Sequence, residues 1–332
     1  MSSREIFWEE EKREGRQEIE DWDAITTVER RFLPPQGTSE RWIFRGERLT
    51  EKSEQQYFPQ NGQAHSCQPQ GQNEEEYLET HLEKAFRLCG VRDEDKIGRE
   101  RELIRTFQRK AALYLDHEPD KDDILEWLAI MRHHGAPTRL LDWGYSFYIA
   151  VYFALSENNG GIVWALDVST INTPKPIEEK IGNTKCHQRY EDFKGYFQEK
   201  SDKLGIRKEG DKLIDLAIAC YFMEHPFPCV YPVNPFRLNK RLSVQQGLFL
   251  MTGDITKSFA ENLTATLGGV EETKHYLRRV KITPDRVRRN EILKKLKDMN
   301  ISNEALFPGL DGFARSVGEG LAYPRPLGDW LA

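Results

Sequence analysis

Short blocks of hydrophobic residues recur along the chain, some with helical spacing and some continuous, as in a buried strand. Apolar positions three and four residues apart predict helical segments, which are residues 22–32, 74–115, 120–131 and 284–299. Short segments rich in apolar residues beside turn residues predict strands, which are residues 41–47, 138–143, 162–168, 239–251 and 276–282. Because the two kinds of block alternate, the pattern predicts a fold of mixed helices and strands.

The densest part of this pattern is the stretch Met131–Glu157. A Gly-Ala-Pro run ends one helix, and residues 138–143 then predict a strand with polar residues at both ends. Ser146 is a typical N-cap for a helix over residues 147–155, which is apolar nearly all round and is therefore expected to be buried. A strand with polar ends beside a buried helix is typical of a binding site, so we take this stretch as the centre of the molecule.

The composition limits the classes of protein to consider. The net charge of −6 over 332 residues gives no general attraction to nucleic acid or anionic lipid. The five cysteines are widely spaced and odd in number, which favours free thiols over disulfides. The charged N-terminus lacks the apolar core of a signal peptide, and no apolar run reaches the length of a membrane span. We therefore expect a cytoplasmic protein with no membrane partner.

Two long polar segments interrupt the predicted elements. Residues 50–73 are rich in Gln, Ser, Asn and Gly and predict a surface loop, whereas residues 171–212 predict a charged helical insertion. His65 and Cys67 in the loop lack a second close pair of ligands, so we predict no metal site. Walker-type, dinucleotide-binding and zinc-protease motifs do not occur in the sequence either.

Polar residues near the ends of the predicted strands are the candidates for chemistry. They are Arg45, His133, His134, Thr138, Arg139, Asp142, Arg241, Gln245 and Gln246. Such a mixture of cations, hydroxyls and amides suits a phosphate-bearing ligand, because arginines bind phosphate oxygens in pairs. Gly46, beside Arg45, would let a ligand approach the backbone closely.

Each candidate also has a purely structural explanation. The two histidines suit the carbonyl end of the preceding helix, and Asp142 suits a buried ion pair with Arg139 or Arg241. The run 245–247 suits a bulge that bends a strand. The sequence leaves the functional and the structural explanation open.

Together these residues resemble the FRG-domain family, which is named for a Phe-Arg-Gly element like Phe44–Gly46. The resemblance includes further segments, which are Trp127–Gly135, Pro137–Trp143, Val151–Ala154, Arg241–Phe249 and Leu306–Gly312. On this basis the chain divides into an N-terminal helix and linker (1–37), an FRG domain (38–318) and a C-terminal tail (319–332).

The domain is also similar, more distantly, to ADP-ribosyltransferases of the arginine-serine-glutamate type. Arg45 matches the arginine of their first strand, and residues 138–154 resemble their second strand and the helix after it. The similarity implies an α+β fold whose core is a split antiparallel sheet with helical insertions. On the third strand, two glutamines stand where the glutamate is expected. Asp142 or Glu47 would then have to supply the charge that stabilises an oxocarbenium-like transition state.

The resemblance implies an intracellular nucleotide-binding effector that cleaves NAD, as an ADP-ribosyltransferase or a glycohydrolase. It also implies a toxin in bacterial antiviral defence, with an antitoxin or other protein as a partner. The catalytic residues would be His134, Asp142 and Gln246. The residues that bind the substrate NAD would be Arg45, Gly46, His133, Thr138, Arg139, Trp143, Arg241 and Gln245.

Two other hypotheses stay open. The first is a nucleotide- or nucleic-acid-binding module without turnover, in which arginines bind phosphates and Trp143 stacks on a base. The second is a metal-independent ribonuclease, with His133 and His134 as acid and base.

Overall fold

The computed structural model describes residues 19–33, 41–49, 78–115, 117–157, 160–169, 171, 219–220, 222–234 and 240–319. The predicted loop over residues 50–73, with His65 and Cys67, lies outside the described residues. So do all but the first residue of the insertion predicted over 171–212, and the tail from residue 320 onwards.

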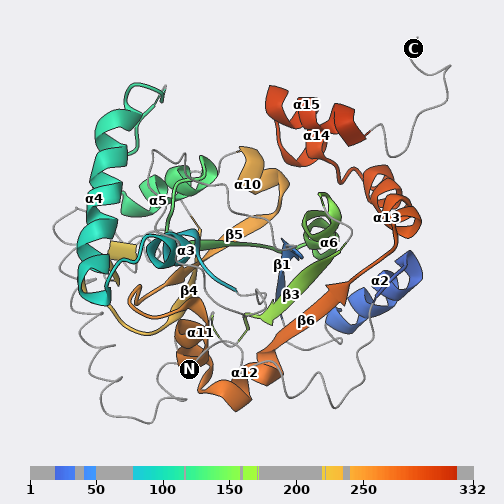
Figure 1. The fold of residues 1–332 in the computed structure, drawn as a ribbon, viewed down its shortest axis with the longest axis horizontal. Helices are drawn as coiled ribbons and strands as arrows, with labels where there is room; N and C mark the ends of the chain where they lie inside the picture. Colours follow the sequence, from blue (N-terminus) through green and yellow to red (C-terminus); the bar gives the residue numbers. More distant parts are fainter. Residues whose placement is uncertain are drawn as a thin grey trace, which may run out of the picture.

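An open antiparallel sheet forms the centre of the described structure (Figure 1). Its strands are β1 (Trp42–Arg48), β2 (Leu140–Gly144), β3 (Gly161–Asp167), β4 (Val230–Val233), β5 (Gly247–Thr252) and β6 (Leu277–Ile282). They lie in the order β4-β5-β2-β1-β3-β6, and each neighbouring pair is antiparallel. With its helices, the chain therefore has an α+β fold, as the sequence predicts.

The sheet is weakly joined at its centre. Strand β1 pairs with β3 along its whole length, and β2 does the same with β5. Between β1 and β2, within these two fully described strands, one register pair joins the halves: Phe44 opposite Gly144. Side chains of β1 beyond this pair therefore have room to reach the backbone of β2.

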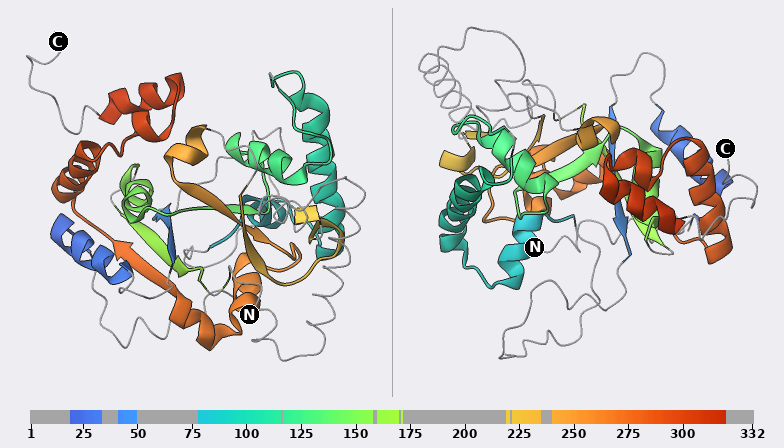
Figure 2. Two further views of the ribbon diagram at one scale, coloured as in Figure 1. Left: turned by 180° about the vertical axis from the view of Figure 1, so that it is seen from behind. Right: turned by 90° about the horizontal axis from the view of Figure 1, so that it is seen from above.

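Helices lie around both ends of the sheet. They are α2 (Trp22–Glu29), α3 (His81–Leu88), α4 (Asp93–Ala111), α5 (Ile124–His133), α6 (Phe147–Leu155), α10 (Lys240–Val244), α11 (Phe259–Leu267), α12 (Val270–Tyr276), α13 (Arg286–Asp298), α14 (Asn303–Leu306) and α15 (Leu310–Glu319). Helices α3, α4 and α5 gather near the β4 end, whereas α2 and α13–α15 lie toward the β6 end (Figures 1 and 2).

Helix α6 is the most buried of these helices, as its sequence predicts. Ser146 is its N-cap, and the Ser146 hydroxyl accepts a hydrogen bond of 3.3 Å from the Ile149 amide. Its apolar side chains pack between β1, β3, α2 and α13. Gly46 and Gly161 let the helix backbone approach the sheet, because a Cβ at Gly46 would lie 1.9 Å from the Ala150 carbonyl oxygen.

The role predicted for Gly46 is therefore wrong: helix α6, not a ligand, occupies the space above it. We expect Gly46→Ala to lower the free energy of unfolding by about 3 kcal/mol, since backbone rather than a flexible side chain must move. Urea denaturation measures this effect. Gly98→Ala is the matched control, because a Cβ there meets no atom within 4 Å. Equal stability of the two variants would contradict the close packing of α6.

Two predicted boundaries also change. Strand β2 begins at Leu140 rather than at residue 138, which places Asp142 in mid-strand. The segment predicted as a strand over 239–251 forms helix α10 and then β5. The Gln245 amide donates to the Arg241 carbonyl at 2.9 Å, and Gln246 then turns the chain with a positive φ of 49°.

Candidate functional site

Asp142 is the centre of a charged cluster drawn from three elements. Arg132, on α5, donates through Nε to Asp142 Oδ2 at 2.6 Å, and its Nη2 contacts the same oxygen. Arg45 of β1 reaches across the weak β1–β2 junction and donates through Nη1 to the Asp142 carbonyl at 2.9 Å. Its Nη1 also lies 3.9 Å from Oδ2. Two guanidinium groups thus face one carboxylate.

The Asp142 carboxylate is ionised and partly open. Burial works to raise its pKa, but the positive charges of Arg132 and Arg45 outweigh burial and hold the pKa below the usual value of 3.8. Its side chain keeps 41% of its surface exposed. Oδ1 accepts no hydrogen bond from any residue that the structure describes, so it is available to a ligand hydroxyl.

Glu47 is the other carboxylate that could replace the glutamate of ADP-ribosyltransferases, but both of its oxygens already accept hydrogen bonds. Its Oε1 accepts a hydrogen bond of 2.7 Å from Arg45 Nε, and its Oε2 accepts one of 3.0 Å from Trp164 Nε1. Its side chain is 19% exposed, against 41% for Asp142. Glu47 therefore orients Arg45, and Asp142 is the carboxylate that can meet a ligand.

His81, at the start of α3, completes the cluster. Its Nδ1 contacts Arg132 Nη1. Because a guanidinium has donors and no acceptor, Nδ1 must accept, and the ring is neutral. Burial, followed by the charges of Arg132 and Arg45, lowers the pKa of His81 from 6.5 to about 4, although the residue keeps exposed surface.

The low pKa of His81 gives the protein a defined pH response. The unfolded chain takes up this proton near pH 6.5 and the folded chain near pH 4. The stability that depends on the neutral ring is therefore present above pH 6.5 and is lost as the pH falls toward 4. We expect His81→Asn to lose less stability than the wild type between pH 7 and pH 5 in urea denaturation. A His81 titration midpoint near 6.5 by NMR would contradict the contact with Arg132.

His133 and His134 form the C-terminal end of α5, as the structural explanation predicts. His134 is the C-cap, and its amide donates to the Ile130 carbonyl at 3.1 Å. The two rings meet edge to face with centroids 4.8 Å apart. Burial, His134 and Arg241 lower the pKa of His133, so this ring is neutral at pH 7.

Arg241, Gln245 and Gln246 come from the α10–β5 turn, next to the end of β2. Arg241 is close enough to Asp142 for their charges to interact. Gln245 Nε2 donates to the Leu306 carbonyl at 3.0 Å, so this amide is structural. Gln246 is exposed, and its carbonyl accepts a hydrogen bond of 3.0 Å from the Tyr145 amide.

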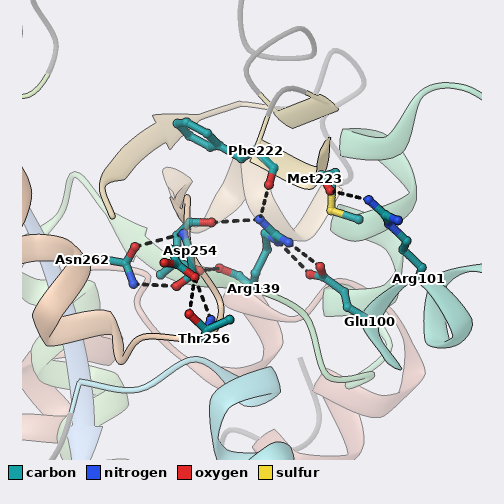
Figure 3. Close-up of polar contacts among 9 residues, drawn as sticks. Glu100, Arg101, Arg139, Phe222, Met223, Asp254, Thr256 and Asn262 are labelled. Atoms are coloured by element: carbon teal, nitrogen blue, oxygen red, sulfur yellow. Dashed lines mark hydrogen bonds and ion pairs between the residues drawn. The ribbon is translucent and has the colours of Figure 1, made fainter. Parts of the chain in front are cut away.

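Arg139 lies in a different, buried network that Figure 3 shows. It is 1% exposed, and it pairs with Glu100 of α4, which is 2% exposed. Its Nη1 also donates to the carbonyls of Phe222 and Thr252, at 3.4 and 3.2 Å. The prediction that Arg139 binds a ligand is therefore corrected, because its guanidinium ties α4 and the 222–223 segment to β2 and β5.

Two other predicted binding residues are buried in the core. Thr138 is 0% exposed, and its carbonyl accepts a hydrogen bond of 3.2 Å from the Leu82 amide. Trp143 is 3% exposed and packs with Leu141, because alternate residues of β2 face the same side of the sheet. Asp142 projects to the opposite side. Neither Thr138 nor Trp143 can stack on or bind a ligand in this arrangement.

Sequence reasoning missed Arg132 and His81. Arg132 directly precedes the two histidines, and its positive charge beside them is the sequence feature that could have indicated a place in the site. His81 falls among residues that recur at helical steps, a pattern that gives no sign of a site. Both become part of the site because Arg132 of α5 contacts Asp142 of β2, and His81 of α3, 51 positions before Arg132, contacts Arg132 in turn.

Comparison with known proteins gives a family match for part of the chain. Residues 15–161 match the model of the FRG domain, a match that includes Arg45, His81, Arg132 and Asp142. The chain contains an FRG domain over residues 15–161. Searches of curated proteins and of solved structures found no match.

The FRG-domain match begins before α2 and ends at the start of β3, so it covers β1, β2 and α3–α6. Strands β4–β6 complete the same sheet from beyond the match. Within the described residues, no three His, Cys, Asp or Glu side chains are grouped to hold a metal ion. No described helix is long and apolar enough to cross a membrane.

Proposed function

We propose that this FRG-domain protein binds NAD at the β1–β2 junction and cleaves the bond between nicotinamide and ribose. One observation carries the proposal: a partly exposed, ionised carboxylate, Asp142, with one free oxygen, is held by two arginines. The weak junction between two fully paired halves of the sheet agrees with the split sheet implied by the similarity to ADP-ribosyltransferases.

In this proposal Asp142 takes the role that the glutamate has in ADP-ribosyltransferases. Asp142 Oδ1 accepts a hydrogen bond from a ribose hydroxyl. As nicotinamide leaves with the bonding electron pair, the Asp142 carboxylate stabilises the positive charge that develops on the ribose. Arg132 and Arg45 hold the carboxylate in place and keep it ionised. The exposed Gln246 offers an amide to the same hydroxyls without adding charge.

The second half of the reaction needs a nucleophile at the ribose carbon. Water gives ADP-ribose and one released proton, and a protein or nucleic-acid hydroxyl or amine gives an ADP-ribosylated product. In this proposal His134, which is exposed at the end of α5, accepts that proton. Depletion of NAD by such a reaction would account for a toxic effector in bacterial defence, which is part of the same proposal.

The test is incubation of the purified protein with NAD, followed by chromatography of free nicotinamide and by a search for ADP-ribose on added protein and RNA. We expect nicotinamide to accumulate in the wild type. If neither nicotinamide nor a labelled acceptor forms, cleavage of NAD is excluded and the enzyme proposal fails.

Binding without turnover is the second candidate, and the exposed Gln246 favours it, because a glutamine supplies no anion. In that case NAD or ADP-ribose binds and no nicotinamide is released. The ribonuclease hypothesis has less support. With the His133 and His134 rings in edge-to-face contact at 4.8 Å, a scissile phosphate has no room between an acid and a base.

A further inference from the structure

Two arginines meet the ring of one phenylalanine beside the charged cluster. The guanidinium carbon of Arg241 lies 4.6 Å from the centroid of the Phe307 ring, and that of Arg315 lies 5.6 Å from it. Arg241 comes from α10, and Arg315 comes from α15. Their positive charges repel each other, which helps to lower the pKa of Arg241 after the larger effect of burial.

Neither guanidinium has an acceptor. Arg241 is half-buried, yet its guanidinium makes no hydrogen bond or ion pair within the described part of the chain, and the same holds for the guanidinium of the exposed Arg315. No nitrogen of Arg241 is buried without a partner, and Arg315 is exposed, so the N–H donors of both groups are open to solvent and available to an anion. Stacking on Phe307 orients the groups and leaves their donors free.

The element around Phe307 is built to hold this ring. A Cβ at Gly312 would lie 1.8 Å from the Phe307 carbonyl oxygen, so glycine is what lets α15 pack on that residue. Gln245 Nε2 donates to the Leu306 carbonyl, which ties the element to the turn after Arg241. Phe153 of α6 meets the Phe307 ring edge-on at 6.0 Å. The ring is thus fixed to the sheet core, the α10 turn and α15.

We propose that Arg241 and Arg315 form the subsite for the diphosphate of a dinucleotide, with Phe307 as the positioning residue. The identity of the ligand rests on the proposed function. Arg45 and Arg132 are paired with the carboxylates of Glu47 and Asp142, and His81 is neutral at pH 7. Arg241 and Arg315 have no carboxylate partner within the described residues, which leaves two positive charges. A dinucleotide diphosphate carries two negative charges. The ribose of the dinucleotide then lies toward Asp142, because Asp142 is close enough to Arg241 for their charges to interact.

Calorimetric titration of the full chain with ADP-ribose and with inorganic pyrophosphate tests this subsite. ADP-ribose has the diphosphate but no bond to nicotinamide, so its binding does not depend on catalysis. We expect Arg241→Gln and Arg315→Gln each to weaken ADP-ribose binding roughly tenfold or more, as for a lost hydrogen bond to a charged group. Phe307→Leu keeps the apolar contact and is expected to weaken binding by a smaller factor.

Arg99→Gln is the matched control, because Arg99 is an exposed arginine of α4 paired with Glu102, and its loss should leave binding unchanged. Arg315 is exposed, so Arg315→Gln tests the subsite even where Phe307→Leu fails to fold. Equal affinity of the wild type and the Arg241→Gln, Arg315→Gln double variant would overturn the proposal. So would absence of ADP-ribose binding, or arginine-dependent binding of an oligoribonucleotide alone. If ADP-ribose binding depends on both arginines but NAD stays intact, the subsite stands and the proposed reaction fails.

Discussion

Replacing Arg139 with methionine is expected to lower the free energy of unfolding by about 3–5 kcal/mol, the largest stability effect of any single replacement considered for this protein. The replacement removes both guanidinium contacts to Glu100, which is 2% exposed. The Glu100 carboxylate is then left in the core without a partner. The carbonyls of Phe222 and Thr252 also lose their donor. Urea denaturation followed by circular dichroism measures the loss.

A double variant separates the cost of leaving the Glu100 carboxylate unpaired from the cost of changed side-chain packing. In Arg139→Met with Glu100→Leu no charge is left buried, so much of the lost stability should return. Arg101→Met, in the helix of Glu100, is the matched control, because within the described residues the Arg101 guanidinium makes a single hydrogen bond, of 3.0 Å, to the Met223 carbonyl. An Arg139→Met variant as stable as the wild type would contradict the buried pair.

Replacing Asp142 with asparagine is expected to reduce nicotinamide release from NAD by roughly 100- to 1,000-fold, the usual cost of removing one electrostatic contact to a developing charge. Asparagine keeps the size of the side chain and one oxygen, but it removes the negative charge. Arg132 and Arg45 would then repel each other across the junction, so a modest loss of stability should accompany the loss of activity. Chromatography of nicotinamide at saturating NAD measures the rate.

Gln246→Glu distinguishes the two positions at which an anion could act. If Asp142 supplies the charge, this replacement changes the rate of the wild type little and does not rescue Asp142→Asn. Recovery of the rate in the Asp142→Asn, Gln246→Glu double variant would show instead that the catalytic carboxylate acts from position 246. Glu47→Gln serves as a further control: because Glu47 orients Arg45 through a 2.7 Å contact, its loss should weaken substrate binding more than the maximal rate.

The parts of the fold that sequence predicts well are those in which local pattern and burial agree. The helix over 147–155 and the strand beginning at 162 are almost entirely apolar, and the structure places them, like the strands predicted to begin at 41 and 276, at or within two residues of the predicted bounds. The α10 helix was missed because its five residues are too few for helical periodicity to appear in a pattern.

Site residues are harder to predict because their roles depend on which way a strand faces. Arg139 and Asp142 stand three positions apart in one motif, yet Arg139 turns into the core toward Glu100 and Asp142 turns toward Arg132. A one-residue change in register exchanges the two faces of a strand. Only the packing of α4 and α5, set by contacts distant in sequence, decides which of the two polar residues meets a ligand.

A crystal structure of the Asp142→Asn variant with NAD tests the central claim most directly, because the variant should bind the dinucleotide and cleave it slowly. We expect a ribose hydroxyl within hydrogen-bonding distance of the side chain at position 142, at the junction of β1 and β2, with the diphosphate beside Arg241. NAD bound elsewhere on the molecule, with the junction empty at saturating concentration, would contradict it.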